Sequence, residues 1–195
     1  EKNPHSIPAW LKDEIIRLAN QYQFFHWHLE FPSVFQVPTK GQRADNDQTG
    51  LNGGFDCVLG NPPWEKVQPE EQQYFFTINT QIAEATGNVR KRFIEDLSKN
   101  NPIAFASWCR YKRGIEGMVS LVKCSGTYPL SSCGRLNTYS LFLEISWYLT
   151  QKYDGHVGMI VQTGLVSDDS NKILFSELVR ASVLHSLYDF ENKEN

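Results

Sequence analysis

A four-residue segment carries the side chains best suited to chemistry: Asn61, Pro62, Pro63 and Trp64, directly after Gly60. The side-chain oxygen of Asn61 and the backbone carbonyl of Pro62 are adjacent hydrogen-bond acceptors, and two such acceptors can take both N–H bonds of an amino group. The proline rings restrict the backbone dihedrals, so this carbonyl is oriented before a ligand arrives. The indole of Trp64 adds a flat face for stacking. The segment therefore predicts a site for an aromatic amine.

Such a site would make a conjugated amine more reactive. The lone pair of an amine on an aromatic ring is delocalised into the ring, so the nitrogen is a poor nucleophile. Two acceptors draw this nitrogen toward tetrahedral geometry, and stacking on an aromatic side chain contributes about 1–3 kcal/mol per base. Transfer of a carbon to the nitrogen then requires that the two atoms are held in line. It does not require a serine or cysteine nucleophile or a metal. The alternative is a rigid turn that merely ends a strand, because Asn-Pro is a common turn dipeptide.

The elements around this segment predict a parallel α/β sheet. Residues 55–59 read as a short strand that the two prolines stop, and residues 156–161 and 186–190 read as later strands. Because helices are expected between these strands, the connections are of the right-handed crossover type. In such sheets ligands bind beyond the carboxyl ends of the strands, which is where residues 61–64 lie.

The region before this strand contains a helix, a strand and a loop. Residues 8–22 are expected to form a helix capped by Ser6, with an apolar face made of Leu11, Ile15, Leu18 and Tyr22. The aromatic residues 24–31, which Pro32 follows, are predicted to form a strand. Residues 38–54 are polar and lack periodicity, which predicts a loop.

Helices dominate the prediction after the strand. Residues 65–134 are expected to be a helical and irregular insertion, and residues 137–150, apolar nearly all round, a buried helix. Asp168 and Asp169, after Ser167, read as caps of a further helix. The apolar face of that helix comprises Ile173, Leu174, Leu178 and Ala181.

Composition describes a single globular domain. The chain has 195 residues, a formal charge of -3 and 41% hydrophobic residues, which excludes a disordered or collagenous chain. No apolar run is long enough to suggest a membrane span. The four cysteines are scattered without C-x-x-C spacing, which argues against a zinc site and for a reducing, cytoplasmic setting. Cys57, in the apolar strand, is expected to be a core residue.

Several segments resemble one family of enzymes. Residues 60–64 resemble the N-P-P-aromatic motif, written (D/N)-P-P-(Y/F/W), of S-adenosylmethionine-dependent methyltransferases that modify amino groups of DNA. Residues 25–35 resemble a segment that precedes this motif in large adenine-specific methylases. These include bifunctional type II restriction–modification enzymes and phage-defence (BREX-type) methylases. Later segments resemble theirs in the same order: residues 136–144, 158–165 and 188–193.

The resemblance implies a fold, a reaction and a site. The fold would be α/β, a partial Rossmann-like methyltransferase fold with a helical insertion after the strand that leads into residues 61–64. The reaction would be methylation of the exocyclic N6 amine of adenine in DNA, in restriction–modification or phage defence. S-adenosylmethionine would be the cofactor, and double-stranded DNA with a flipped adenine the partner. The catalytic residues implied are Asn61, Pro62, Pro63 and Trp64.

The expected cofactor loop is missing from the sequence. No G-x-G-x-x-G segment is present, although such methyltransferases need one to bring the cofactor against the backbone. We therefore expect residues 1–195 to be the C-terminal half of a catalytic domain, with residues 65–136 as the helical insertion. The cofactor-loop half and the target-recognition domain would belong to the remainder of a larger enzyme. The isolated chain is expected to bind the cofactor weakly and to be inactive.

Two other functions share these features. A related methyltransferase could act on a protein glutamine amide or on an RNA base, since N-P-P-Y occurs in such enzymes. The second alternative is a non-catalytic module that binds DNA or acts as a scaffold. Residues 65–136 carry 10 basic and 7 acidic residues, with clusters at 90–92 and 110–113 that could meet phosphates or simply form a solvated helix face.

Three further side chains have structural and functional interpretations. His26 and His28 would share one face of the expected strand, as in some metal sites, but lack further ligands. Glu30 falls where such methylases carry an acid near the cofactor's adenine, and it can equally be a solvated or capping residue.

Overall fold

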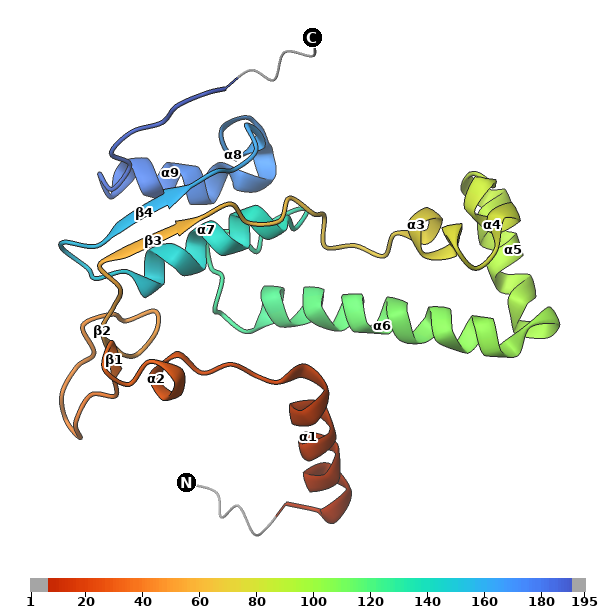
Figure 1. Cartoon of the computed structure of the whole chain (residues 1–195), viewed down its shortest axis with the longest axis horizontal. Coiled ribbons are helices and arrows are strands. Elements are labelled where there is room, and N and C mark those ends of the chain that lie inside the picture. Colours follow the sequence, from red (N-terminus) through yellow and green to blue (C-terminus); the bar gives the residue numbers. More distant parts are fainter. Residues whose placement is uncertain (1–6, 191–195) are drawn as a thin grey trace.

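The computed structural model describes residues 7–190, and its helices outnumber its strands (Figure 1). The N-terminal elements are α1 (Ala9–Tyr22), α2 (Trp27–Glu30), β1 (Phe35–Gln36), β2 (Asn52–Gly53) and β3 (Cys57–Gly60). The middle of the chain forms α3 (Glu71–Phe76), α4 (Thr80–Glu84), α5 (Gly87–Asn100) and α6 (Pro102–Cys124). The remainder forms α7 (Thr138–Leu149), β4 (His156–Met159), α8 (Gly164–Ser167), the 3-10 helix η2 (Asp169–Asn171) and α9 (Lys172–Arg180).

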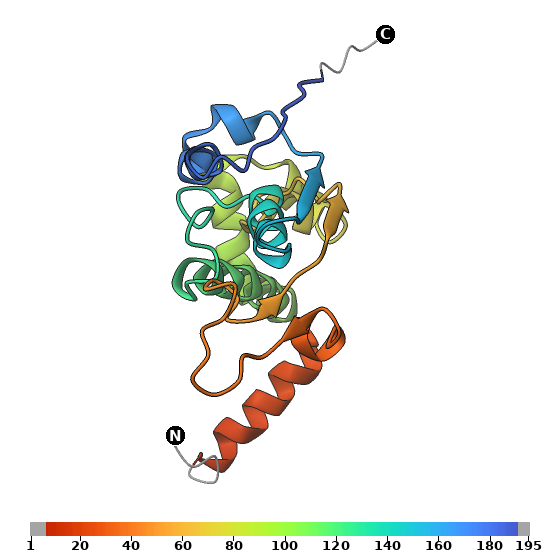
Figure 2. The same cartoon turned by 90° about the vertical axis from the view of Figure 1, so that its left-hand side faces the viewer.

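Strands β3 and β4 pair in parallel, as predicted. Val58 lies opposite Val157, and the pairing runs the length of both strands. Helices α7 and α9 lie on the same face of this pair in both views (Figures 1 and 2). The mixed helix-and-sheet class with a small parallel sheet is therefore confirmed.

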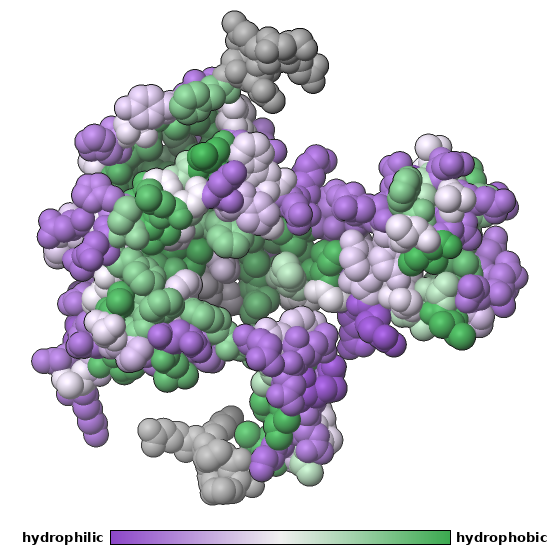
Figure 3. All heavy atoms as spheres, viewed as in Figure 1, coloured by the Kyte–Doolittle hydropathy of each residue, from purple (hydrophilic) through white to green (hydrophobic). Residues whose placement is uncertain are grey.

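The opposite face of the strands is open. Leu59 is 78% exposed and Ile160 60% exposed, and hydrophobic residues gather over β3 and β4 on this face (Figure 3). Successive side chains of a strand point to opposite faces, so Cys57 shares the open face with Leu59. Cys57 is exposed, and the prediction that it is a core residue is wrong.

The aromatic segment at residues 24–31 is not a strand, contrary to the prediction. It contains one turn of helix, α2, because Trp27 and Phe31, four residues apart, both pack against Phe55. Their ring centroids lie 5.9 and 5.3 Å from that of Phe55. Buried Phe35 completes the cluster, with a ring centroid 5.1 Å from Phe55. The contacts of the rings, and not pairing of the backbone, set the conformation here.

Helix α1 has the predicted bounds within one residue, but it buries none of its residues. Leu11 and Leu18 of the expected apolar face are half-buried, whereas Ile15 is 50% exposed. The helix extends away from the rest of the molecule (Figures 1 and 2). The expected cap, Ser6, lies outside the described residues.

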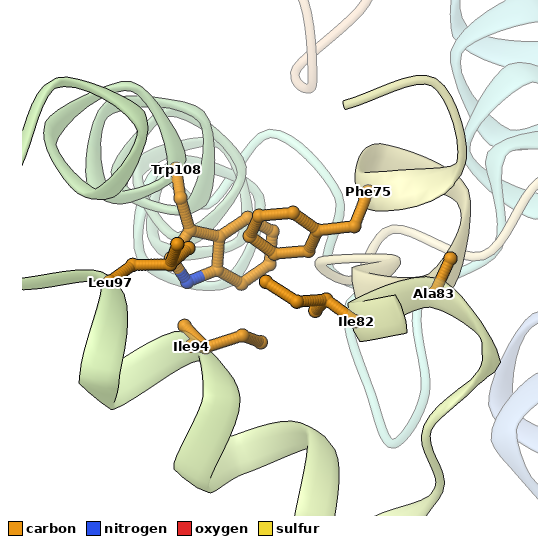
Figure 4. Packing of buried hydrophobic residues seen from close by; sticks show 6 residues of the cluster. All are labelled: Phe75, Ile82, Ala83, Ile94, Leu97 and Trp108. Carbon is orange, nitrogen blue, oxygen red and sulfur yellow. The ribbon is translucent and has the colours of Figure 1, made fainter. Parts of the chain in front are cut away.

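Helices α3 to α6 confirm the helical character predicted for residues 65–134. They form an arm, which extends from the sheet in Figure 1 and is defined by residues 71–124. The arm has a hydrophobic cluster of its own (Figure 4), made of Phe75, Ile82, Ala83, Ile94, Leu97 and Trp108. A second cluster, of Val122, Leu136 and Leu141, joins the end of α6 to α7.

Helix α7 forms where predicted but is buried only in part, since Phe142 is 46% exposed. Asn137 caps it by accepting a hydrogen bond from the amide of Tyr139 at 3.3 Å. The prediction that Asp168 and Asp169 cap the next helix is wrong. Neither η2 nor α9 has a side-chain capping bond, because Asn171 at this junction is used in contacts with α7. Residues 186–190, predicted as a strand, are exposed and have no regular structure, since no described strand pairs with them.

Candidate functional site

Residues 61–64 lie at the carboxyl end of β3. The amide of Ile160 donates to the carbonyl of Gly60 at 3.0 Å, so the two strands stay paired up to the point where the segment begins. Pro62 is buried, and Asn61 and Pro63 are exposed. The amide of Asn61 is therefore accessible at the end of the sheet, on a backbone that is held in the protein.

Trp64 is fixed by its ring nitrogen. The indole Nε1 donates a hydrogen bond to the carbonyl oxygen of Ile160 at 3.3 Å, and the side chain remains 45% exposed. The bond ties the segment after β3 to the residue after β4. Much of the indole surface therefore stays accessible to solvent.

Thr138, the first residue of α7, contacts the same segment. Its hydroxyl donates to the carbonyl of Pro63 at 2.5 Å and accepts from the amide of Glu65 at 2.9 Å. The amide of Thr138 donates in turn to the carbonyl of Glu65 at 2.9 Å. Sequence analysis did not identify Thr138, since only the Asn137–Thr138 start of a helix marks it and the contact spans 75 positions.

A buried polar network attaches the loop after β4 to the first turn of α7. The Asn171 amide nitrogen donates to the Tyr139 hydroxyl and to the Gly164 carbonyl, both at 2.8 Å. The Ser140 hydroxyl donates to the Asn171 amide oxygen at 2.6 Å. Three consecutive residues, 138 to 140, thus hold the segments that follow both strands.

Glu144 is fully buried in α7 and accepts bonds from the loop before this helix. Its carboxylate accepts from the amides of Leu130 and Ser131 at 2.9 and 2.8 Å, and from the Ser131 hydroxyl. The hydroxyl of Tyr148 donates to it at 2.8 Å. Burial, followed by this bond to Glu144, raises the pKa of Tyr148 above its ordinary value. A buried carboxylate with four donors is well satisfied and serves the structure of the loop.

The histidines and Glu30 do not form a site with residues 61–64. His26 precedes α2 and His28 lies within it, so they do not share a strand face as predicted; their ring centroids are 6.1 Å apart. Glu30, the last residue of α2, is exposed. Among residues 7–190, no group of three or more His, Cys, Asp or Glu side chains is placed to hold a metal ion.

The basic clusters divide between structure and surface. Arg90 donates to the carbonyls of Ile82 and Ala83 at 3.1 and 2.9 Å, which joins α5 to the end of α4. Lys112 lies 3.7 Å from Glu116 in an exposed ion pair on α6. Exposed cations of the two clusters remain on the arm: Lys91, Arg92, Arg110 and Arg113.

Comparison with known families identifies the class of the chain. The profile of the Eco57I restriction-modification methylase family matches residues 1–105, more than half of the sequence, including residues 61–64. The chain belongs to this family of restriction–modification methylases. No curated protein and no solved structure matches it. Within residues 7–190, no helix is both long enough and apolar enough to cross a bilayer.

Two open hollows lie near the start of β3 within residues 7–190. Asp45, Gly53 and Gln151 line both, and neither hollow includes any of residues 61–64. The Asn61 side chain is exposed at the end of the sheet, and the sequence has no glycine-rich loop against which S-adenosylmethionine could lie. No cofactor contact is therefore assigned to residues of this chain.

Proposed function

We propose that this chain supplies the amine-binding half of an active site that methylates N6 of adenine in DNA. The observation that carries the proposal is the accessible Asn61 amide at the end of β3, beside the indole of Trp64 held against Ile160. Membership of a restriction–modification methylase family supports DNA as the substrate. The arrangement suits a planar base that carries an amino group.

Each residue has a defined role in this proposal. The side-chain oxygen of Asn61 and the carbonyl of Pro62 accept the two N–H bonds of the amine, which frees the nitrogen lone pair. Burial of Pro62 holds its carbonyl in place without reorganisation, and Pro63 restricts the following dihedral. Trp64 stacks on an adenine turned out of the duplex, and such a contact contributes about 1–3 kcal/mol.

The rest of the active site lies in other parts of the proposed enzyme. S-adenosylmethionine is the proposed methyl donor, since a methyl group bound to a sulfonium is the carbon that such an amine accepts. We propose that residues 1–195 form the second half of the catalytic domain and that another part of the enzyme carries the glycine-rich loop. The exposed cations Arg110 and Arg113 on α6 would add contacts to phosphates of DNA.

The proposal is tested with the enzyme that contains this chain. It is expressed in cells that lack other DNA methylases, and their DNA is digested to nucleosides and measured by mass spectrometry. Wild type is expected to produce N6-methyladenine, and Asn61→Ala to reduce the rate at least about 100-fold, as for other lost catalytic hydrogen-bonding groups. The control is Asn88→Ala, an exposed position in the first turn of α5.

Three results would contradict the proposal. Undiminished N6-methyladenine in Asn61→Ala removes the assigned role of that side chain. Methylation of glutamine or RNA in the same cells, with no N6-methyladenine in DNA, favours the alternative substrates. No methylation of DNA, RNA or glutamine leaves a non-catalytic DNA-binding or scaffolding role.

A further inference from the structure

We infer that Thr138 is a positioning residue that sets the orientation of Trp64 toward the substrate base. The inference rests on the proposed function, because it assigns Trp64 a ligand. Thr138 touches no substrate atom in this scheme. It acts through the peptide groups on the two sides of Trp64.

The Thr138 hydroxyl joins these two peptide groups. It donates to the Pro63 carbonyl at 2.5 Å and accepts from the Glu65 amide at 2.9 Å. A hydroxyl is the group that can donate and accept at the same point, whereas an aliphatic side chain of similar shape can do neither. Removal of the oxygen leaves both flanking peptides of Trp64 without their partner.

Packing alone does not hold the Trp64 ring. The side chain is 45% exposed, and its one polar contact within residues 7–190 is the bond from Nε1 to the Ile160 carbonyl at 3.3 Å. The ring is therefore fixed at one edge by β4 and through its backbone by α7. Loss of the hydroxyl contact leaves this long bond and the bond from the Thr138 amide to the Glu65 carbonyl at 2.9 Å as the remaining polar restraints.

A helix can begin with this Asn-Thr pair without such a hydroxyl contact, as the start of α4 shows. Asn79 and Thr80 begin α4 in the same way that Asn137 and Thr138 begin α7, with the asparagine side chain capping each helix. Thr80 is exposed, and its hydroxyl makes no side-chain hydrogen bond within residues 7–190. The contact made by Thr138 is thus specific to the segment around Trp64.

The experiment compares Thr138→Val, Thr138→Ser and the matched control Thr80→Val in the enzyme that contains this chain. Hydrogen exchange measures the Glu65 amide, and DNA methylation is measured in the same preparations. Thr138→Val is expected to accelerate exchange of the Glu65 amide at least about 10-fold and to slow methylation about 10- to 100-fold. Thr138→Ser keeps the hydroxyl and should stay within about 3-fold of wild type in both measurements, as should Thr80→Val.

A second readout reports on the ring. DNA with 2-aminopurine at the target position fluoresces when the base leaves the duplex, and stacking on Trp64 quenches it. Thr138→Val is expected to lose the quenched component while still binding DNA. If Thr138→Val does not fold, as judged by circular dichroism, Thr138→Ala is measured in its place.

The outcomes separate this inference from the proposed function. Suppose that the wild-type enzyme methylates DNA and that Thr138→Val changes neither the methylation rate nor the exchange of the Glu65 amide. This result overturns the positioning role. A faster Glu65 exchange with full methylation also overturns it, because the contact would then be structural only. If the wild-type enzyme produces no N6-methyladenine, the proposed function is overturned instead. The ligand assigned to Trp64 is then lost as well.

Discussion

Two half-buried tyrosines, Tyr148 in α7 and Tyr128 in the loop before this helix, contribute to the response of the protein to alkaline pH. Burial and the hydrogen bond to Glu144 raise the pKa of Tyr148, and burial raises the pKa of Tyr128 as well. A tyrosine in the unfolded chain loses its proton near pH 10. Above that pH the folded state retains a proton that the unfolded state has lost. Stabilisation from these groups is therefore complete below about pH 10 and declines as pH rises further.

Tyr148→Phe is expected to flatten this decline. The variant cannot ionise at position 148, so its free energy of unfolding should fall less steeply between about pH 10 and 11 than that of wild type. Ionisation of Tyr128 still lowers the free energy of unfolding in this pH range, so part of the decline remains in the variant. Urea unfolding at a series of pH values measures the effect, with Tyr153→Phe, at an 87% exposed position, as the control. Equal slopes in Tyr148→Phe and wild type would contradict the assignment.

At the residue scale, sequence analysis singled out residues 61–64 as a candidate site, which stays a prediction, and missed the residues that hold this segment in place. Residues 61–64 are recognisable because the restricted backbone of proline and the amide of asparagine follow from the residue type alone. The role of Thr138 depends on a contact across 75 positions, and that of Asn171 on contacts across 31 and 32. A threonine or an asparagine can make many different hydrogen bonds, and the sequence does not show which of them forms in the folded chain.

Among the elements, the junction from β4 to α9 depends on one buried side chain. Asn171 is 3% exposed and bonds to Ser140, Tyr139 and the Gly164 carbonyl. Asn171→Ala would leave these buried groups unpaired, and we expect a loss of about 3 kcal/mol in the free energy of unfolding. Urea denaturation measures this loss, and Asn88→Ala should change stability by less than about 0.5 kcal/mol. A similarly small effect of Asn171→Ala would mean that the junction is held by its apolar contacts.

Helices were more predictable than strands for a physical reason. The helices at 8–22 and 137–150 follow from local periodicity and capping, and the structure has them at Ala9–Tyr22 and Thr138–Leu149. A strand exists only where a partner pairs with it. Residues 156–161 contain β4, which has β3 as its partner, whereas residues 186–190 have no partner among the described strands. Residues 24–31 instead follow the packing of aromatic rings on Phe55.

At the scale of the whole molecule, the arm and the sheet region have separate hydrophobic clusters. Trp108 is 4% exposed within the arm cluster, while Tyr139, Leu165, Leu174 and Leu178 form the cluster of α7, α8 and α9. The cluster of Val122, Leu136 and Leu141 lies where the end of the arm meets α7. Composition alone predicts a single core, because it records how many apolar residues exist and not how they divide. Two cores joined at a narrow base can lose structure separately.

Trp108→Ala tests this separation. The substitution removes the largest side chain of the arm cluster, and large-to-small changes of this kind cost about 3–5 kcal/mol. We expect amides of α4, α5 and the first half of α6 to lose hydrogen-exchange protection while those of α7 and α9 keep it. Ile103→Ala, at an 84% exposed position on α6, should leave protection unchanged throughout. Loss of protection in α7 and α9 together with the arm would mean that both clusters unfold as one cooperative unit, with the segment around Trp64 dependent on the arm.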